Sequence, residues 1–297
     1  MKKKIGFIGL GVMGLPMCRN LLRAGYPVVA YELRQNVLDE IVKDGAETAA
    51  SCADVASRSD VIITMLPDSP DVRKAVMGPG GVLEGARPGS IIIDMSSIAP
   101  ATSKEVAEAA KARGVRMLEA PVSGGQPGAV AGTLSIMVGG DEADFQECLD
   151  ILKTMGKSVV RVGDIGAGNT TKVCNQIIVA LNIAAVGEAF ALGTKAGVDP
   201  EAIYQAIRGG LAGSNVMDAK VPLLLERKFA PGFRINLHIK DLANALATGK
   251  DVGVPLPFTG LVMQVFQALR AEGKGDLDHG AVATFFEKLA GVEVKKA

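Results

Sequence analysis

A glycine pattern near the N-terminus limits how the first part of this chain can fold. Residues 5–8, IGFI, form an apolar run typical of a short buried strand, and Gly9, Gly11 and Gly14 follow it as G-x-G-x-x-G. Residues 15–23 then continue with helical character. Gly9 permits a tight turn, Gly11 lets a pyrophosphate approach the backbone, and Gly14 lets the helix lie close to the strand. The order strand, glycine turn, helix predicts a dinucleotide-binding unit with phosphates at the helix N-terminus.

Glu32 is the second feature of this unit. A strand expected over residues 27–32 ends in this acid, roughly 20 residues after the glycine motif, where an acidic side chain meets the adenosine ribose hydroxyls. A carboxylate there repels a 2′-phosphate, so Glu32 favours NAD over NADP, while Arg34 two positions further on would soften that preference. The alternative is that Glu32 is a solvated side chain at a strand end.

Length and charge exclude several classes of protein. The 297 residues suffice for two domains, and 32 basic and 32 acidic residues give a net charge of zero, so no nucleic-acid or anionic-membrane partner is expected. The start, MKKKIGFIGLG, is basic and then apolar, but its glycines favour a strand over a signal peptide. No apolar run reaches about 18 residues without a polar interruption, which predicts no membrane span.

The cysteines and histidines give no sign of a disulfide framework or a metal site. His238 and His279 lack H-x-x-x-H spacing, so we expect no metal and no histidine-based triad. Four cysteines form no C-x-x-C pair and lie in helix-like patterns, as the reduced thiols of a cytoplasmic protein do: Cys18, Cys52, Cys148 and Cys174.

Strand and helix patterns alternate up to residue 163, after which only helical patterns occur. The alternation predicts an α/β domain, residues 1–163, with a mostly parallel, doubly wound Rossmann-type sheet that binds a dinucleotide. Residues 164–297 are predicted to form an all-helical substrate and dimerisation domain. Its first helix, expected over residues 169–197, is apolar on nearly every face, which predicts burial between domains or in a subunit interface.

Residues that follow the strands are candidates for ligand contacts, because ligands of such a sheet bind at the carboxyl ends of its strands. Leu66-Pro67, Ser96-Ser97 and Ser123-Gly124-Gly125 each follow a predicted strand. The hydroxyls and bare amides of the last two stretches suit a small anion such as a carboxylate. Alternatively, Ser96-Ser97 caps the next helix and Ser123-Gly124-Gly125 is a plain turn.

Lys172 begins the long apolar helix, and Asn175 and Gln176 follow three and four residues later, so the three side chains share one face. A lysine in an apolar cleft holds its proton less tightly and can act as an acid near neutral pH. The alternative is a solvated lysine in the first helical turn. Lys240-Asp241 interrupts another apolar helix, either as part of a site or as a charge pair on a solvated face.

Five stretches occur in order over nearly the whole chain: FIGLGVMGLPMCRNL, DMSSIAP, APVSGGQPGA, GAGNTTKVCNQ and HIKDLANAL. Together they resemble the successive signatures of the β-hydroxyacid dehydrogenases, a family that includes the 3-hydroxyisobutyrate dehydrogenases and, more distantly, 6-phosphogluconate dehydrogenase. Within the family the resemblance is closest to members that reduce tartronate semialdehyde. It extends there through VIITMLPDSPDV, GTLSIMVGGD, IVALNIAAVGEA and AIRGGLAGS.

The resemblance implies a role for each motif. Lys172 is implied to be the catalytic acid and base, assisted by Asn175, with the substrate carboxylate on Ser123-Gly124-Gly125. Gln176 stands where many members carry a second asparagine, and would take over that substrate contact with a longer reach. Lys240 is implied to reach the cofactor and substrate. The other implied cofactor contacts are Gly9, Leu10, Gly11, Val12, Met13 and Gly14 at the pyrophosphate, Glu32 at the adenosine ribose, Leu66 and Pro67 along the cofactor, and Ser96 or Ser97 beside the nicotinamide ribose.

The implied reaction is reversible hydride transfer between NADH, or NADPH as a second option, and an aldehyde with a nearby carboxylate, tartronate semialdehyde, which becomes D-glycerate. The alternatives are 3-hydroxyisobutyrate, or succinic semialdehyde with 4-hydroxybutyrate, and, outside the enzymes, a non-catalytic cofactor-binding scaffold. NADP-preferring members carry Asn-Arg where this chain has Glu32-Leu33-Arg34. Scaffold relatives and imine reductases typically lack the lysine that this chain keeps as Lys172. The resemblance also implies a homodimer or homotetramer.

Overall fold

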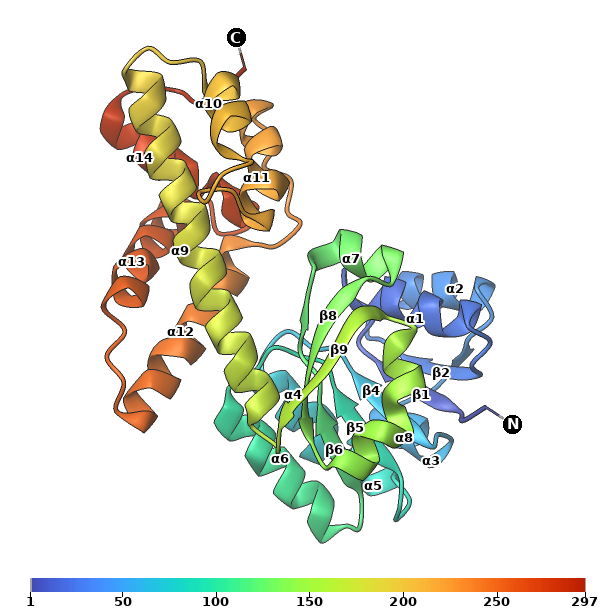
Figure 1. Ribbon diagram of the computed structural model, residues 1–297. Coiled ribbons are helices and arrows are strands. Elements are labelled where there is room, and N and C mark those ends of the chain that lie inside the picture. The colour runs from blue at the N-terminus through green and yellow to red at the C-terminus, as the bar shows by residue number, and fades with distance from the viewer. Residues whose placement is uncertain (1, 297) are drawn as a thin grey trace. The chain divides into compact units, whose positions relative to one another are not determined.

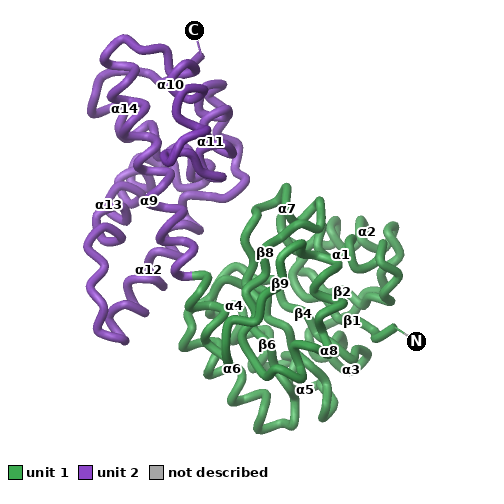
Figure 2. The backbone as a smooth tube through the Cα atoms, in the orientation of Figure 1, with its two compact units in different colours: residues 1–172 green, residues 173–297 purple. Residues whose placement is uncertain are grey.

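The computed structural model describes residues 2–296, which form two compact units that divide after Lys172 (Figure 2). The first unit is a sheet with helices on both faces, and the second is built of helices (Figure 1). This confirms the predicted fold class, an α/β Rossmann-type doubly wound sheet followed by an all-helical domain. The division falls inside helix α9, Ala167–Lys195, whose first turn belongs to the first unit, whereas the sequence analysis placed the boundary after residue 163.

Nine strands form one sheet within the described residues, in the order β3-β2-β1-β4-β5-β6-β8-β7, with β9 also paired to β8. The strands from β3 to β6 are parallel, while β6 and β7 both pair antiparallel with β8. The order reverses between β1 and β4, which is where a doubly wound sheet binds its ligand. The strands are β1 Ile5–Ile8, β2 Val28–Tyr31, β3 Glu47–Thr48, β4 Val61–Thr64, β5 Ile91–Asp94, β6 Arg116–Glu119, β7 Val122–Ser123, β8 Leu134–Gly140 and β9 Gly156–Gly163.

Apolar cores lie on both faces of the sheet, because successive residues of a strand point to opposite sides. In β4, Ile63 belongs to the core with Phe7 and Met17, and Ile62 to the core with Val106. The strands β1, β4 and β5 are therefore buried along their whole length, which explains their continuous apolar sequences. The helices are α1 Gly14–Arg23, α2 Gln35–Lys43, α3 Cys52–Ser57, α4 Ser69–Met77, α5 Val82–Gly85, α6 Pro100–Ala112, α7 Gly125–Ala131 and α8 Glu142–Lys153.

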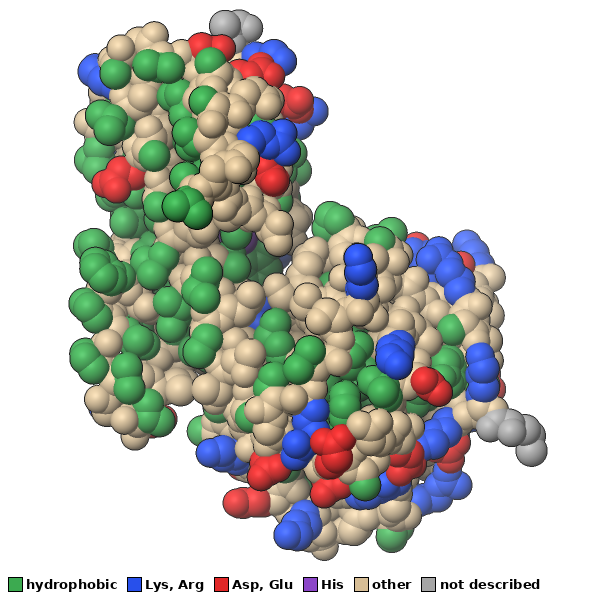
Figure 3. Space-filling model, viewed as in Figure 1, with side chains coloured by type: hydrophobic (Ala, Val, Ile, Leu, Met, Phe, Trp, Pro, Cys, Tyr) green, Lys and Arg blue, Asp and Glu red, His purple; other side chains and the backbone are tan. Residues whose placement is uncertain are grey.

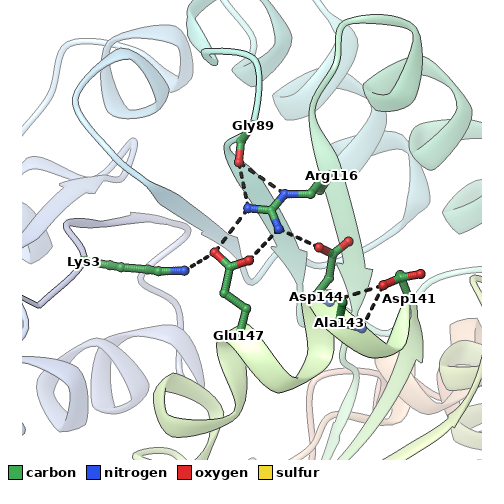
Figure 4. A network of polar contacts seen from close by, with 7 residues as sticks. All are labelled: Lys3, Gly89, Arg116, Asp141, Ala143, Asp144 and Glu147. Atoms are coloured by element: carbon green, nitrogen blue, oxygen red, sulfur yellow. Dashed lines mark hydrogen bonds and ion pairs between the residues drawn. The ribbon is translucent and has the colours of Figure 1, made fainter.

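A charged network ties the amino-terminal edge of the sheet together (Figure 4). Arg116 of β6 lies 2.7 Å from the Asp144 carboxylate and 2.5 Å from the Glu147 carboxylate, both on α8, and donates to the Gly89 carbonyl at 2.9 Å. Lys3 also pairs with Glu147. Hydrogen bonds from the Arg116 and Lys3 side chains lower the pKa of Glu147 to about 2. The network joins four segments that are distant in sequence: Lys3 near the N-terminus, the loop at Gly89, strand β6 and helix α8.

The second unit packs its helices around two cores. Ile183, Leu242 and Phe266 lie in one, and Phe190 and Val221 in the other. The Asp199 carboxylate accepts a hydrogen bond from the Glu201 amide at 3.1 Å and so caps the start of α10. Besides α9, the elements are α10 Pro200–Ile207, α11 Asn215–Leu225, α12 Ile235–Val252, α13 Pro257–Ala271, a 3-10 turn His279–Val282 and α14 Ala283–Ala290.

Helix α9 is long and apolar enough to cross a membrane by composition, with a mean hydropathy of 1.8, and no other helix of residues 2–296 is. Ala180 and Ile183 lie in one core of the helical unit, and Val186 and Phe190 in the other. This packing is typical of the central helix of a folded domain. That the chain has no membrane span stays a prediction.

Candidate active site

The glycine turn lies at the switch point between β1 and β4. Gly9 has φ +92°, and a Cβ there would lie 2.5 Å from the Met65 carbonyl. A Cβ on Gly14 would lie 1.9 Å from the Gly9 carbonyl, so helix α1 packs directly on the turn, whereas a Cβ on Gly11 would meet nothing within 4 Å. No side chain caps the start of α1, and its first turn holds no acid. Tight packing, open space above Gly11 and an uncapped helix fit a dinucleotide pyrophosphate.

Glu32 is held against this turn. Its Oε2 accepts from the Leu10 amide at 2.9 Å, and its Oε1 accepts from the Arg34 guanidinium at 3.0 Å. Burial acts to raise the pKa of Glu32, but hydrogen bonds from Arg34 and Leu10 outweigh it and lower the pKa. The side chain is only 10% exposed, so it is not a solvated strand-end residue. Arg34 lies beside it, with its side chain 55% exposed.

The ends of β4 and β5 are linked by polar side chains. The Ser96 hydroxyl accepts from the Leu66 amide at 2.9 Å, and Asp94 accepts from the Thr64 hydroxyl at 2.8 Å and from the Ser96 amide at 3.2 Å. The alternative that Ser96-Ser97 caps the next helix is wrong, because α6 begins at Pro100 and Ala99 is its N-cap. The structure therefore brings Leu66 and Ser96 together after the ends of β4 and β5. Strand β4 lies next to β1, the strand that the glycine turn follows.

Asp94 is fully buried, and its Oδ2 has no hydrogen-bond partner. Burial raises its pKa to about 6, hydrogen bonds from Ser96 and Thr64 act in the opposite direction, and the negative charge of Glu119 adds to the rise. This carboxyl ends the apolar run of β5, and the motif around it gave no sign of its burial.

Ser123-Gly124-Gly125 joins β7 to helix α7. Gly124 has φ +137° and Gly125 φ +61°, conformations that residues with a side chain rarely adopt. No side chain caps α7. The stretch is thus a glycine turn that leads directly into a helix whose amides no side chain caps, and its role as an anion site stays a prediction.

The start of α9 is fixed to the carboxyl ends of β5 and β6. Glu119, the last residue of β6, accepts from the Gly166 amide at 2.6 Å, the Gly168 amide at 2.7 Å and the Asn169 side chain at 3.0 Å. Asn169 in turn accepts from the Ile98 amide, in the loop after β5, at 3.1 Å. Lys172 follows one turn later, so this joint carries it to the edge of the sheet where the other candidate residues lie.

Lys172 is 8% exposed, and Gln176 is 5% exposed on the same helix. The alternative of a solvated first-turn lysine is therefore wrong. Helix α9 is continuous over these residues, so Lys172, Asn175 and Gln176 share one face as predicted.

Asp241 connects two predicted site residues of the helical unit. Its carboxylate accepts from the Gln176 side chain at 2.5 Å and pairs with the Lys240 ammonium at 3.0 Å. Because the Asp241 side chain is 4% and the Lys240 side chain 16% exposed, the pair does not lie on a solvated face. His238 and His279 are packed nearby, with their Nδ1 atoms 3.0 Å apart and His238 Nε2 3.3 Å from the Gln176 carbonyl.

The sequence offers no reason to assign a role to Glu119 or Asn169, although both stand inside or directly beside the quoted motifs, and it leaves Asp241 open as part of a site or of a solvated charge pair. The sequence signal that could have indicated these residues is an acidic or amide side chain directly beside an apolar strand or helix pattern. Within the described part of the chain, no group of three or more His, Cys, Asp or Glu side chains is placed to hold a metal ion.

Two family profiles match the chain. One is described as the NAD binding domain of 6-phosphogluconate dehydrogenase and matches residues 4–163. The other is described as NAD-binding of NADP-dependent 3-hydroxyisobutyrate dehydrogenase and matches residues 166–286.

Similar proteins align with nearly the full length. 2-Hydroxy-3-oxopropionate reductase of Escherichia coli is 43% identical over 97% of this chain and 98% of its own. 2-(Hydroxymethyl)glutarate dehydrogenase of Eubacterium barkeri is 42% identical over 98% of this chain and 97% of its own. Among solved structures, 3-hydroxyisobutyrate dehydrogenase of Mycobacterium tuberculosis with L-serine has a TM-score of 0.87 at 33% identity, covering 96% of this chain and 99% of that chain.

Proposed function

Because this chain belongs to the NAD(P)-dependent β-hydroxyacid dehydrogenases, we propose that it reduces tartronate semialdehyde to D-glycerate, with Lys172 as the proton donor. The family makes the chain an oxidoreductase that uses NAD(P). The substrate and the roles of individual residues are the proposal.

The observation that carries the proposal is the joint between Glu119 and the first turn of α9. It brings buried Lys172 to the carboxyl ends of β5 and β6, the same edge from which Ser96 and Ser123 follow. A buried lysine at the ligand edge of a dinucleotide-binding sheet suits proton transfer to a bound aldehyde.

In the proposed reaction, a bound NADH or NADPH would supply a hydride for the aldehyde carbon. The Ser123-Gly124-Gly125 amides hold the substrate carboxylate, which fixes the position of the aldehyde. Lys172 donates a proton to the oxygen as negative charge develops there, and in the reverse direction it takes that proton from the alcohol. Asn175, on the same helix face, orients the substrate. That Lys240 and Gln176 contact ligands follows from the resemblance and stays a prediction.

The compounds that the relatives are named for correspond to hydroxy acids with one shared chemical unit. Glycerate, which forms when 2-hydroxy-3-oxopropionate is reduced, 2-(hydroxymethyl)glutarate and 3-hydroxyisobutyrate are all HOCH2–CHR–COO⁻ and differ only in R, which is a hydroxyl, a carboxyethyl or a methyl group. The relatives named for the first two are 43% and 42% identical to this chain, so overall identity does not choose between them. The proposed carboxylate contact at Ser123-Gly124-Gly125 and the proposed proton donor Lys172 would serve all three hydroxy acids. The side chains around R would then set the preference among the substrates.

A comparison of substrates tests the proposal. Oxidation of NADH or NADPH is followed at 340 nm with tartronate semialdehyde, the aldehydes of 2-(hydroxymethyl)glutarate and 3-hydroxyisobutyrate, and succinic semialdehyde. The proposal expects kcat/KM for tartronate semialdehyde at least about tenfold above the others, or about 1.4 kcal/mol of transition-state preference. A higher kcat/KM for another of these aldehydes would overturn the substrate assignment and leave the family activity intact.

Exposed apolar side chains of the helical unit support a homo-oligomer. Ile178 and Leu192 on α9 are 64% and 71% exposed, and Phe258 and Leu261 on α13 are 70% and 67% exposed. Figure 3 shows hydrophobic side chains gathered over this part of the unit. Large exposed apolar residues in such number favour subunit contact. Light scattering at micromolar concentration should give a dimer or tetramer, and a monomer would contradict the idea.

Free thiols support a cytoplasmic location. Within residues 2–296 all four cysteines are free, as is usual in a reducing compartment. Cell fractionation would test this assignment.

A further inference from the structure

Glu119 is a buried carboxylate whose bonds all go to one helix start. It has no exposed surface, and its donors are the amides of Gly166 and Gly168 and the side chain of Asn169. Within residues 2–296, no basic side chain forms an ion pair with it. A buried carboxylate without a cation is stabilised by amide donors and by the positive end of a helix, and α9 supplies both.

The contacts between Glu119 and the first turn of α9 are tightly packed. A Cβ on Gly168 would lie 2.6 Å from the Met137 carbonyl, and a Cβ on Gly139 would lie 2.4 Å from Glu119 Oε1. The first turn of α9 therefore rests on the backbone of β8, and the Glu119 carboxylate fills the remaining space.

Asn169 extends the joint to two more segments. Its carbonyl oxygen accepts from the Ile98 amide at 3.1 Å, and its amino group donates to the Ser103 hydroxyl on α6 at 2.9 Å as well as to Glu119. Bonds therefore reach the first turn of α9 from three directions, which holds that turn in place within the first unit.

Lys172 lies four residues after Gly168 and three after Asn169, so it shares their helix face. We propose that Glu119 is a positioning residue that acts through Lys172: it sets where the ammonium group stands relative to the substrate oxygen. The inference rests on the proposed role of Lys172. Small displacements of a proton donor slow proton transfer strongly, since the donor must lie within hydrogen-bond reach.

The test is the variant Glu119→Gln. It keeps the size of the side chain but removes the charge, and its amino group must face the donating side chain of Asn169 or the backbone amides. We expect kcat per folded site to fall at least tenfold, while the Kd for NADH changes less than twofold. Folded sites are counted by NADH titration and checked by far-UV circular dichroism. Glu119→Asp keeps the charge and should recover part of the lost kcat.

A matched control is Glu287→Gln in the helical unit. Glu287 is also a buried carboxylate, 5% exposed, and accepts from the Val294 amide at 2.8 Å and from Arg227. None of its partners is a proposed site residue. Glu287→Gln should lower stability and leave kcat per folded site within twofold.

The decisive measurement is a double-mutant cycle with Lys172→Ala. If Glu119 acts through Lys172, adding Glu119→Gln to Lys172→Ala lowers the residual rate less than twofold. An equal loss in both backgrounds would overturn the inference, since Glu119 would then act independently of the lysine. If Glu119→Gln does not fold, Ser103→Ala, which removes only the outer bond of Asn169, takes its place with an expected severalfold loss of kcat.

The cycle also separates this inference from the proposed function. Near-normal turnover of Lys172→Ala would refute the lysine's role and with it the inference. A large loss in Lys172→Ala together with full turnover of Glu119→Gln would refute the inference alone.

Discussion

Replacing Asp94 by asparagine should stabilise the protein at neutral pH. Asp94 is fully buried, its Oδ2 has no partner, and burial raises its pKa from 3.8 to about 6. Because the folded state disfavours the charged form, the contribution of Asp94 to stability is fully present below pH 3.8 and is lost as the pH rises through about 6. At about 1.4 kcal/mol per pKa unit, the charged carboxylate costs at most about 3 kcal/mol above pH 7.

The variant Asp94→Asn avoids this cost. The amide oxygen can still accept from the Thr64 hydroxyl and the Ser96 amide, and an unpaired amino group takes the place of the unpaired Oδ2. Urea unfolding followed by far-UV circular dichroism should show a free energy of unfolding about 2–3 kcal/mol above wild type at pH 7.5, with the difference falling to about 1 kcal/mol near pH 4.5. Glu142→Gln, on the surface, is the control and should change little at either pH.

Two results would refute this reasoning. A destabilised Asp94→Asn at pH 7.5 would mean that the charged carboxylate is needed by its neighbours. A difference from wild type that does not change with pH would mean that Asp94 does not titrate between pH 4 and 7.

Three further predictions concern the first unit. Gly14→Ala should raise the Kd for NADH at least tenfold by fluorescence titration, because its Cβ would lie 1.9 Å from the Gly9 carbonyl; unchanged binding would contradict the tight helix packing. Glu32→Gln should raise kcat/KM with NADPH relative to NADH about tenfold, since the charge that repels a 2′-phosphate is removed, and an unchanged ratio would deny Glu32 that role. Glu147→Gln should lower the free energy of unfolding by about 1 kcal/mol or less at pH 7, because the ion pairs of Glu147 with Arg116 and Lys3 are partly exposed to solvent. Since the pKa of Glu147 is lowered to about 2, this cost is present above about pH 4.5 and should vanish as the pH falls toward 2, as urea unfolding at several pH values would show.

Elements with continuous apolar sequences were predictable. The strand at Val61–Thr64 and the helix at Ala167–Lys195 both lie where such runs were expected, and the switch to helical patterns alone marked the second domain. The short elements were missed. Val82–Gly85 and Gly125–Ala131 are helices of one or two turns, and β7 spans two residues, which is too short for any period to show.

The site was predictable where a residue's chemistry depends on its neighbours in sequence. Gly9 and Gly14 are examples, because their positions in G-x-G-x-x-G predict the tight turn and the close helix packing that the structure has. The contact of Glu32 with Leu10 follows from the same βαβ unit. Glu119 and Asn169 are of another kind: they lie 50 residues apart in sequence, and only the packing of β6 against α9 reveals their bond. Asp241, which bridges Gln176 and Lys240, is likewise defined by contacts between helices.

The measurement that tests the central claim most directly is the turnover of Lys172→Ala beside Lys172→Arg, with NADH binding measured on the same samples. Arginine keeps the positive charge but does not release a proton near neutral pH, so it separates proton transfer from charge. The account predicts that both variants bind NADH with a Kd within twofold of wild type and that both lose about 10²- to 10⁴-fold in kcat. Near-full kcat of Lys172→Ala with tartronate semialdehyde, at unchanged NADH binding, would contradict it.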